Sequence, residues 1–143
     1  MAAGNFILYQ HGIQAILRGD IDHQSTTLTV ALVSAGYTPS QASHSAWTQV
    51  STYEVTTTGY AARNIAGGAV DLQSNSHVRF DANDITLSAT DVMTAKYAVL
   101  RAQGSGVPIG YVDLDTGSSS GVDATQITVQ WNANGIYRIN QSI

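Results

Sequence analysis

Residues 127–139 read ITVQWNANGIYRI, and this stretch carries the clearest structural signal in the chain. Apolar and polar residues alternate from Ile127 to Trp131, which is the period of a β-strand with one buried face. Asn134 and Gly135 follow, and this pair favours a two-residue turn because both residues tolerate a positive φ. The stretch therefore predicts a C-terminal β-hairpin with Trp131 in the core.

The same two-residue period recurs upstream. Residues 26–33 alternate, with Leu28, Val30 and Leu32 on one face and threonines on the other. Residues 97–100 are apolar without alternation, as expected for a central strand buried on both faces. Further strands are predicted at residues 54–57, 60–64, 69–73, 78–80, 85–87 and 109–114. Many short strands with frequent turn residues predict an all-β fold, an antiparallel β-sandwich or jelly roll.

One segment has a helical period instead. Residues 5–18 place Phe6, Tyr9, Ile13, Ile16 and Leu17 three or four residues apart, which predicts one N-terminal α-helix with a single apolar stripe. Gly19 is a suitable left-handed stop. We expect this helix to pack on the sandwich rather than to extend as a docking arm. Helix and strands, the latter within about residues 26–140, are expected to form one domain over residues 1–143.

Composition excludes several classes of protein. The 143 residues include no cysteine, so disulfides, thiolate metal sites and cysteine nucleophiles are ruled out. The net charge of −4, with six basic residues, argues against a nucleic-acid partner. No apolar run approaches the roughly 20 residues of a membrane span, and the first five residues lack the basic start of a secretory signal. The charged fraction is 11%, against roughly 25% in ordinary domains, so hydroxyls and amides must dominate the surface.

Three short motifs were tested for chemistry. Residues 117–121 (GSSSG) match the pattern of a nucleophile elbow, but no helical period follows them, so we interpret them as a hairpin loop. Residues 113–117 (DLDTG) resemble the opening of a calcium loop, but the only glutamate of the chain is Glu54, so the bidentate twelfth ligand is missing. Residues 81–84 (DAND) are interpreted as an Asx-rich turn, with weak calcium binding as the minor alternative.

Isolated polar and aromatic residues give no assembled site. The four histidines, His11, His23, His44 and His77, show no paired ligand spacing. Eight aromatic residues are candidates for stacking sugars or bases, although core packing explains them more simply. They are Tyr37, Trp47, Tyr53, Tyr60, Tyr97, Tyr111, Trp131 and Tyr137. We therefore expect no catalytic, cofactor-binding or metal-binding residues, no cofactor and no enzymatic activity.

An ordered series of short motifs resembles a family of small virion structural proteins of tailed bacteriophages. The motifs lie at residues 9–17 (YQHGIQAIL), 19–22, 28–33, 36–39, 54–55, 59–60, 80–85, 96–100, 109–113 and 128–136. The resemblance covers nearly the whole chain and is most like capsid decoration (cement) proteins. It brings no catalytic residues with it.

The resemblance implies a function. It predicts a non-enzymatic protein that binds the outer surface of the major capsid shell, stabilises it, and assembles as a homo-oligomer, a dimer or a trimer. The expected location is the capsid exterior of the virion, and the host cytoplasm during assembly. Two alternatives stay open: a tail or baseplate component, and a carbohydrate-binding module for host attachment.

Overall fold

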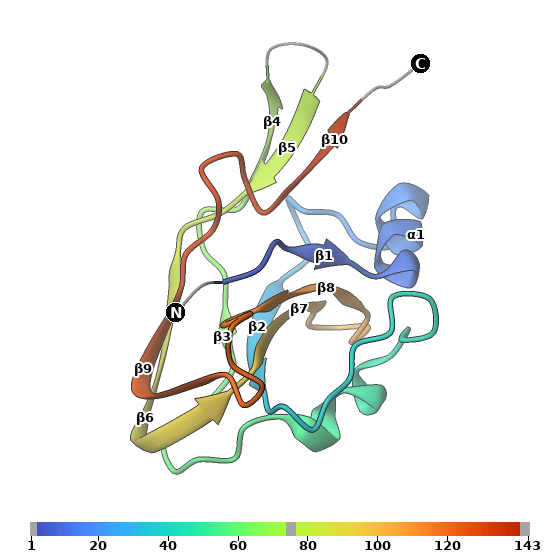
Figure 1. Ribbon diagram of the computed structural model, residues 1–143. Coiled ribbons are helices and arrows are strands. Elements are labelled where there is room, and N and C mark those ends of the chain that lie inside the picture. Colours follow the sequence, from blue (N-terminus) through green and yellow to red (C-terminus); the bar gives the residue numbers. More distant parts are fainter. Residues whose placement is uncertain (1–2, 74–76, 141–143) are drawn as a thin grey trace.

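A computed structural model describes residues 3–73 and 77–140, and antiparallel strands dominate it (Figure 1). The elements are β1 (Ile7–Leu8), α1 (Gln10–Arg18), β2 (Leu28–Val33), η1 (Trp47–Gln49), η2 (Ser51–Tyr53), β3 (Arg63–Asn64), β4 (Ala69–Gln73), β5 (His77–Asp81), β6 (Ile85–Ala95), β7 (Tyr97–Ala102), β8 (Pro108–Asp113), β9 (Val122–Val129) and β10 (Tyr137–Asn140). The predicted all-β class with a single α-helix is confirmed for the described residues, and the jelly-roll strand order stays a prediction.

The largest sheet has five strands in the order β1-β8-β7-β2-β3. β7 lies at its centre, and three of the four residues at 97–100 are buried, as predicted. The neighbouring strand β2 differs from the prediction because all six of its residues are buried. Thr29, expected on an exposed face, is 3% exposed, and its hydroxyl donates a hydrogen bond of 2.9 Å to Oδ1 of Asn64 on β3.

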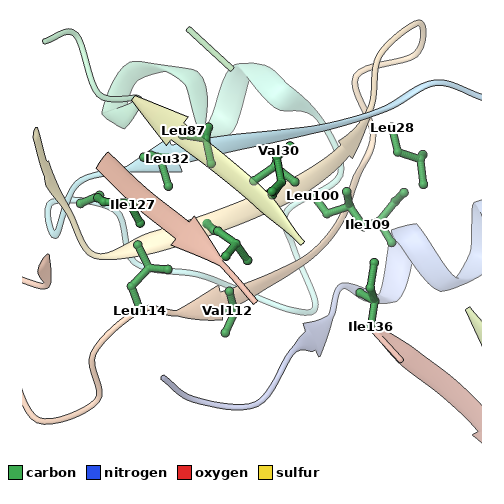
Figure 2. Close-up of a cluster of buried hydrophobic side chains, with 14 of the residues drawn as sticks. Leu28, Val30, Leu32, Leu87, Leu100, Ile109, Val112, Leu114, Ile127 and Ile136 are labelled. Carbon is green, nitrogen blue, oxygen red and sulfur yellow. The ribbon is translucent and has the colours of Figure 1, made fainter. Parts of the chain in front are cut away.

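The core lies between this sheet and the two-stranded ribbon β6-β9. Figure 2 shows aliphatic side chains from β2, β7 and β8 meeting those from β6 and β9. They include Leu28, Val30, Leu32, Leu87, Leu100, Ile109, Val112, Leu114 and Ile127, joined by Ile136. A smaller cluster on the other face of the sheet contains Tyr9, Val33, Tyr37, Val50 and Val99. The five-stranded sheet is therefore covered on both faces, which explains the complete burial of β2.

The N-terminal helix is shorter than predicted. It spans Gln10–Arg18, and the residues before it form strand β1, whose Ile7 and Leu8 pair with Tyr111 and Gly110 of β8. Pairing with an open sheet edge satisfies these backbone groups, and this competes with the helical preference that the side-chain spacing indicates. The predicted stop is confirmed, since Gly19 caps the helix with a φ of 82°.

The helix uses only part of the predicted apolar stripe, in which Ile16 packs against the core and Tyr9 is fully buried. It lies on β8, as expected, but its buried residues are Gly12 and Ala15. Ile13 and Leu17 of the predicted stripe are 37% and 72% exposed. The small residues Gly12 and Ala15 let the helix backbone approach the sheet closely, while Ile13 and Leu17 lie toward solvent.

The C-terminal hairpin prediction is wrong in its pairing. β9 pairs with β6 over seven residue pairs, and β10 pairs with β5, so the two predicted hairpin strands lie in different sheets. The connecting turn is closed by a 2.8 Å hydrogen bond from the Gly135 amide to the Asn132 carbonyl, and Gly135 has a φ of 96°. Trp131 is only half-buried, and its indole N–H donates to the carbonyl of Asn83. Strand β6 has 11 residues, so it can pair with more residues of β9 than the four-residue strand β10 could.

Two further strand predictions are corrected. Residues 54–57 form a single bridge between Glu54 and Val33, and residues 60–64 contribute only the two-residue strand β3. Here side-chain contacts replace a sheet ladder: the Tyr60 hydroxyl accepts a hydrogen bond from the Leu32 amide and donates one to Glu54. The remaining predicted strands are confirmed, with β6 extended as far as Ala95.

Candidate functional site

The loop that resembles a calcium site closes around a lysine. The ammonium of Lys96 lies 2.8 Å from Oδ1 of Asp113 and donates hydrogen bonds of 2.7 and 2.6 Å to the carbonyls of Asp115 and Ser118. Only 9% of the Lys96 side chain is exposed. The oxygens that would coordinate a calcium ion in such a loop therefore bind the ammonium group of Lys96 instead. Residues 113–118 enclose this group, and we call them the cage around Lys96.

The serine-rich motif belongs to the same loop. Residues 117–121 connect β8 to β9, so no helix follows the serines as a nucleophile elbow requires. The Ser118 hydroxyl accepts a hydrogen bond from the Gly121 amide, and Gly121 has a φ of 93°. These bonds shape the turn into β9. The segment is a loop, as predicted, but the hairpin loop expected here is wrong, because β8 pairs with β7 and β9 pairs with β6.

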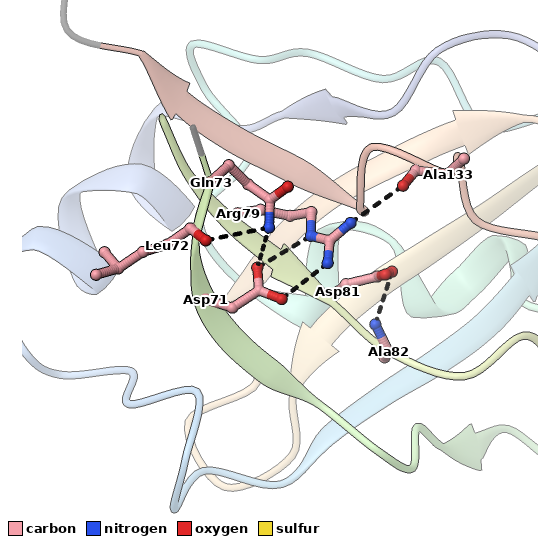
Figure 3. Close-up of polar contacts among 7 residues, drawn as sticks. All are labelled: Asp71, Leu72, Gln73, Arg79, Asp81, Ala82 and Ala133. Carbon is pink, nitrogen blue, oxygen red and sulfur yellow. Dashed lines mark hydrogen bonds and ion pairs between the residues drawn. The ribbon is translucent and has the colours of Figure 1, made fainter. Parts of the chain in front are cut away.

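The aspartates near β5 also have structural partners. In the turn 81–84, Asp81 accepts a hydrogen bond from the Ala82 amide and Asp84 accepts one from the Trp131 amide. On the adjacent strands, Arg79 forms two hydrogen bonds to Asp71, of 3.0 and 2.8 Å, and a third to the Ala133 carbonyl (Figure 3). The hydrogen bonds from Arg79 lower the pKa of Asp71 below its ordinary value.

The four histidines lie apart. His11 is exposed on α1, and His77 begins β5. His23 stacks on the Phe80 ring with centroids 4.0 Å apart, its Nε2 contacts the Tyr137 hydroxyl, and burial lowers its pKa. His44 accepts a 2.7 Å hydrogen bond from the Tyr37 hydroxyl through Nδ1. Within residues 3–73 and 77–140, no three His, Asp or Glu side chains are arranged to hold a metal ion.

Most of the candidate aromatic rings pack against other groups rather than forming a binding platform. The Tyr9 and Tyr37 hydroxyls lie 2.6 Å apart in the smaller core cluster, and burial raises the pKa of both phenols. Tyr97 and Tyr111 pack against this cluster, and Tyr53 lies beside Tyr37. Arg101 lies over the Trp47 ring, 4.5 Å from its centroid. These contacts hold residues 34–53 against the sheet.

One groove of about 430 Å³ runs beside the N-terminal segment. Asn5, Phe6, Gln130, Trp131 and Asn132 line it, together with aliphatic residues from β8 and β9. The Phe6 and Trp131 rings meet nearly at right angles, 84° apart, so they offer no flat pair of rings for a sugar. The lining contains no charged side chain, so the groove holds no carboxylate or imidazole for acid–base catalysis.

The most unusual feature of the described surface is apolar. Eight large hydrophobic side chains are exposed. Two lie on α1 (Ile13 and Leu17), and four lie on the three-stranded sheet β10-β5-β4: Val70, Leu72, Val78 and Ile139. We call these four residues the outer apolar face. The sequence analysis predicted strands at residues 69–73 and 78–80 but not their exposure, because exposure depends on which other parts of the fold cover the sheet.

The helices within the described residues are all too short and too polar to cross a membrane. Comparison of the chain with models of protein families, with curated proteins and with solved structures finds no match.

Proposed function

We propose that this chain is a non-enzymatic structural protein of a tailed-bacteriophage virion, a capsid decoration protein. In this role it binds the outer surface of the major capsid shell as a homo-oligomer and stabilises the shell. The observation that carries the proposal is the exposed apolar surface on a chain with only 11% charged residues. Contiguous exposed apolar patches are typical of surfaces that bind other proteins.

The exposed side of α1 is our candidate for the contact with the shell. Leu17 is 72% exposed there, and the helix is held on β8 through Gly12 and Ala15, so the side chain stands on a fixed element. Many symmetric copies make weak contacts of this kind add up through multivalency. Low charge density also reduces repulsion between crowded copies, and the net charge of −4 favours solubility of the free protein.

Binding to purified, expanded capsids tests this proposal. We expect saturable binding at a stoichiometry set by the capsid lattice and a higher rupture temperature of the shell, because a ligand that binds only the intact state stabilises it. Leu17→Glu should weaken shell binding at least tenfold. Gln14→Glu adds the same charge at an exposed position of the same helix and serves as the matched control.

The alternatives give different results in the same experiment. Copies found only along the tail, with no change in shell rupture, would reject the decoration role and favour a tail or baseplate component. The carbohydrate-binding alternative has less support, because the rings of Phe6 and Trp131 in the groove are perpendicular.

A further inference from the structure

Strand register gives the β10-β5-β4 sheet two chemically different faces. Leu72, Val78 and Ile139 pair across the three strands and form one apolar row. The next row on the same face is Val70, Phe80 and Tyr137, two residues along each strand. The residues between these rows point to the opposite face, where Asp71, Arg79 and Arg138 lie side by side. The sheet is therefore amphipathic, like one that buries its apolar face.

The inner row is covered at Phe80 but not at Val70, which is 42% exposed. Phe80 is 2% exposed because His23 stacks on it and Tyr137 packs beside it. In the outer row, however, Leu72 is 85% exposed and Ile139 is 53% exposed. Figure 1 shows β4, β5 and β10 extending together beyond the rest of the fold. The outer row thus lies past the elements that cover Phe80.

Charge selects the kind of partner that fits this face. Neither row contains a charged side chain, because Asp71, Arg79 and Arg138 lie on the other face. A charged partner would lose hydration here without gaining a counter-charge. The fitting partner is therefore an apolar, uncharged surface of similar width, and the same face of a second copy has these properties.

The exposed apolar area supplies the centre of a paired interface and needs a polar rim to complete it. At their exposed fractions, Val70, Leu72, Val78 and Ile139 together present on the order of 400 Å² of apolar surface, the size of the largest patch on a typical protein. Two such faces in contact would bury about 800 Å² of apolar surface before their polar rims are counted. Stable interfaces bury about 1,200–2,000 Å² in total, and the polar rim commonly supplies such a difference.

We propose that the outer apolar face is a self-association surface, on which a second copy packs its own β10-β5-β4 sheet face to face across a two-fold axis. Face-to-face packing requires the axis to lie between the two sheets. Val78 is on the central strand, so an axis that passes over the outer row places Val78 opposite Val78 of the second copy. The proposal names the surface through which the homo-oligomer of the proposed function forms. It rests on the proposed function only for the expectation that the chain self-associates.

Sedimentation velocity over a concentration series tests the surface. We expect the wild-type chain to form a species of twice its mass of 15.1 kDa. Leu72→Glu should weaken this association at least tenfold while leaving the circular dichroism spectrum unchanged, since Leu72 is 85% exposed. Leu17→Glu is the matched control, the same substitution at an exposed leucine outside the sheet, and it should remain dimeric. A monomeric wild type at several hundred micromolar, or a dimeric Leu72→Glu, overturns the proposal.

Cross-linking tests the geometry independently of affinity. The chain has no cysteine, so a single Val78→Cys introduces the only thiol. Sheets packed face to face lie about 10 Å apart, which is too far for a disulfide between opposed strands, so a bismaleimide of about that length is the suitable cross-linker. We expect it to join Val78→Cys chains into covalent dimers rapidly, whereas Val92→Cys, exposed on β6, should stay largely monomeric. Equal cross-linking of both variants overturns the two-fold arrangement. These readouts use the free protein, so a dimer that binds no capsid would reject the decoration role and leave this surface intact.

Discussion

Lys96 is the only lysine of the chain and, within the described residues, its only buried cationic side chain. An ammonium ion loses hydration on burial, and this cost is offset only when its protons meet acceptors in good geometry. Here the Asp113 carboxylate and the carbonyls of Asp115 and Ser118 meet it at 2.6–2.8 Å. The lysine therefore ties the 113–121 loop to the start of β7.

Removing this ammonium should be costly. We expect Lys96→Met to lower the free energy of unfolding by about 2–4 kcal/mol, because it leaves a partly buried carboxylate and two carbonyls without their partner. Urea denaturation measures the change. Arg18→Met is the control, since the Arg18–Asp20 pair is about two-thirds exposed and should contribute less than about 1 kcal/mol. Equal effects of the two substitutions would contradict the assigned role of Lys96.

His23 makes stability depend on pH. Burial disfavours its charged form and lowers its pKa below the ordinary 6.5, while Asp22 opposes this shift more weakly. The unfolded chain therefore takes up a proton near pH 6.5, and the folded chain takes it up only at lower pH. The contribution of His23 to stability is complete above about pH 6.5 and falls as the pH drops below that value.

Urea midpoints measured between pH 7.5 and pH 5.5 test this pH dependence. We expect the wild type to lose stability over this range and His23→Gln to lose less, because glutamine does not titrate. The pKa of Asp22 is lowered from 3.8, so this carboxylate titrates below the window. His11→Gln, at an exposed position on α1, should keep the wild-type slope. Parallel slopes for the wild type and His23→Gln would refute the role of His23.

At the scale of elements, α1 shows how a small residue determines which face of a helix is buried. A Cβ atom on Gly12 would lie 2.8 Å from the Cα of Ile109, closer than real Cβ contacts allow. The helix backbone therefore touches β8 directly at Gly12, while Ile13 and Leu17 lie toward solvent. Hydrophobic periodicity does not mark glycine as a buried position. For this reason the sequence analysis placed Ile13 and Leu17, which are exposed, on the buried side of the helix.

Gly12→Ala tests this close approach. Alanine normally stabilises a helix by about 1 kcal/mol relative to glycine. Here we expect the opposite sign, a destabilisation of about 1–3 kcal/mol, because the added methyl group overpacks the contact with β8. Thermal unfolding measures it. Gly104→Ala is the control, because a Cβ atom at Gly104 meets open space and should change stability by less than about 0.5 kcal/mol. A stabilised Gly12→Ala would disprove the close packing.

The strands show which parts of the fold the sequence could predict. Alternation is local, so the positions of β4, β5 and β8 were predicted to within about two residues. Pairing is not local: β9 joins β6, about forty residues earlier, rather than the strand that follows it. The Asn134–Gly135 signal indicated a turn correctly, but a turn need not join paired strands. Partner choice depends on the summed contacts of whole strands, which no short pattern contains.

At the scale of the whole molecule, the candidate surface was hidden for a related reason. Composition indicated a charge-poor exterior, and the strand register shows that β4, β5 and β10 carry one apolar face. An apolar face of this kind is normally buried under another part of the chain or under a partner. The structure shows that the described residues leave the outer row exposed. The motifs also did not predict the cage around Lys96, because its oxygens come from a loop about twenty residues away in the sequence.

A charge-poor contact should respond to salt in a characteristic way. Raising sodium chloride from about 0.1 M to about 1 M shortens the screening length from about 10 Å to about 3 Å, which weakens exposed ion pairs. Because the outer apolar face has no charged side chain, we expect the dimer dissociation constant to change less than about threefold. Sodium sulfate should strengthen the association, since it favours apolar burial. Sedimentation equilibrium in both salts measures this, with Leu17→Glu again as the control. A steep weakening in sodium chloride would mean that ion pairs hold the copies together, and the contact would then lie outside the outer apolar face, for example on the opposite face that carries Asp71, Arg79 and Arg138.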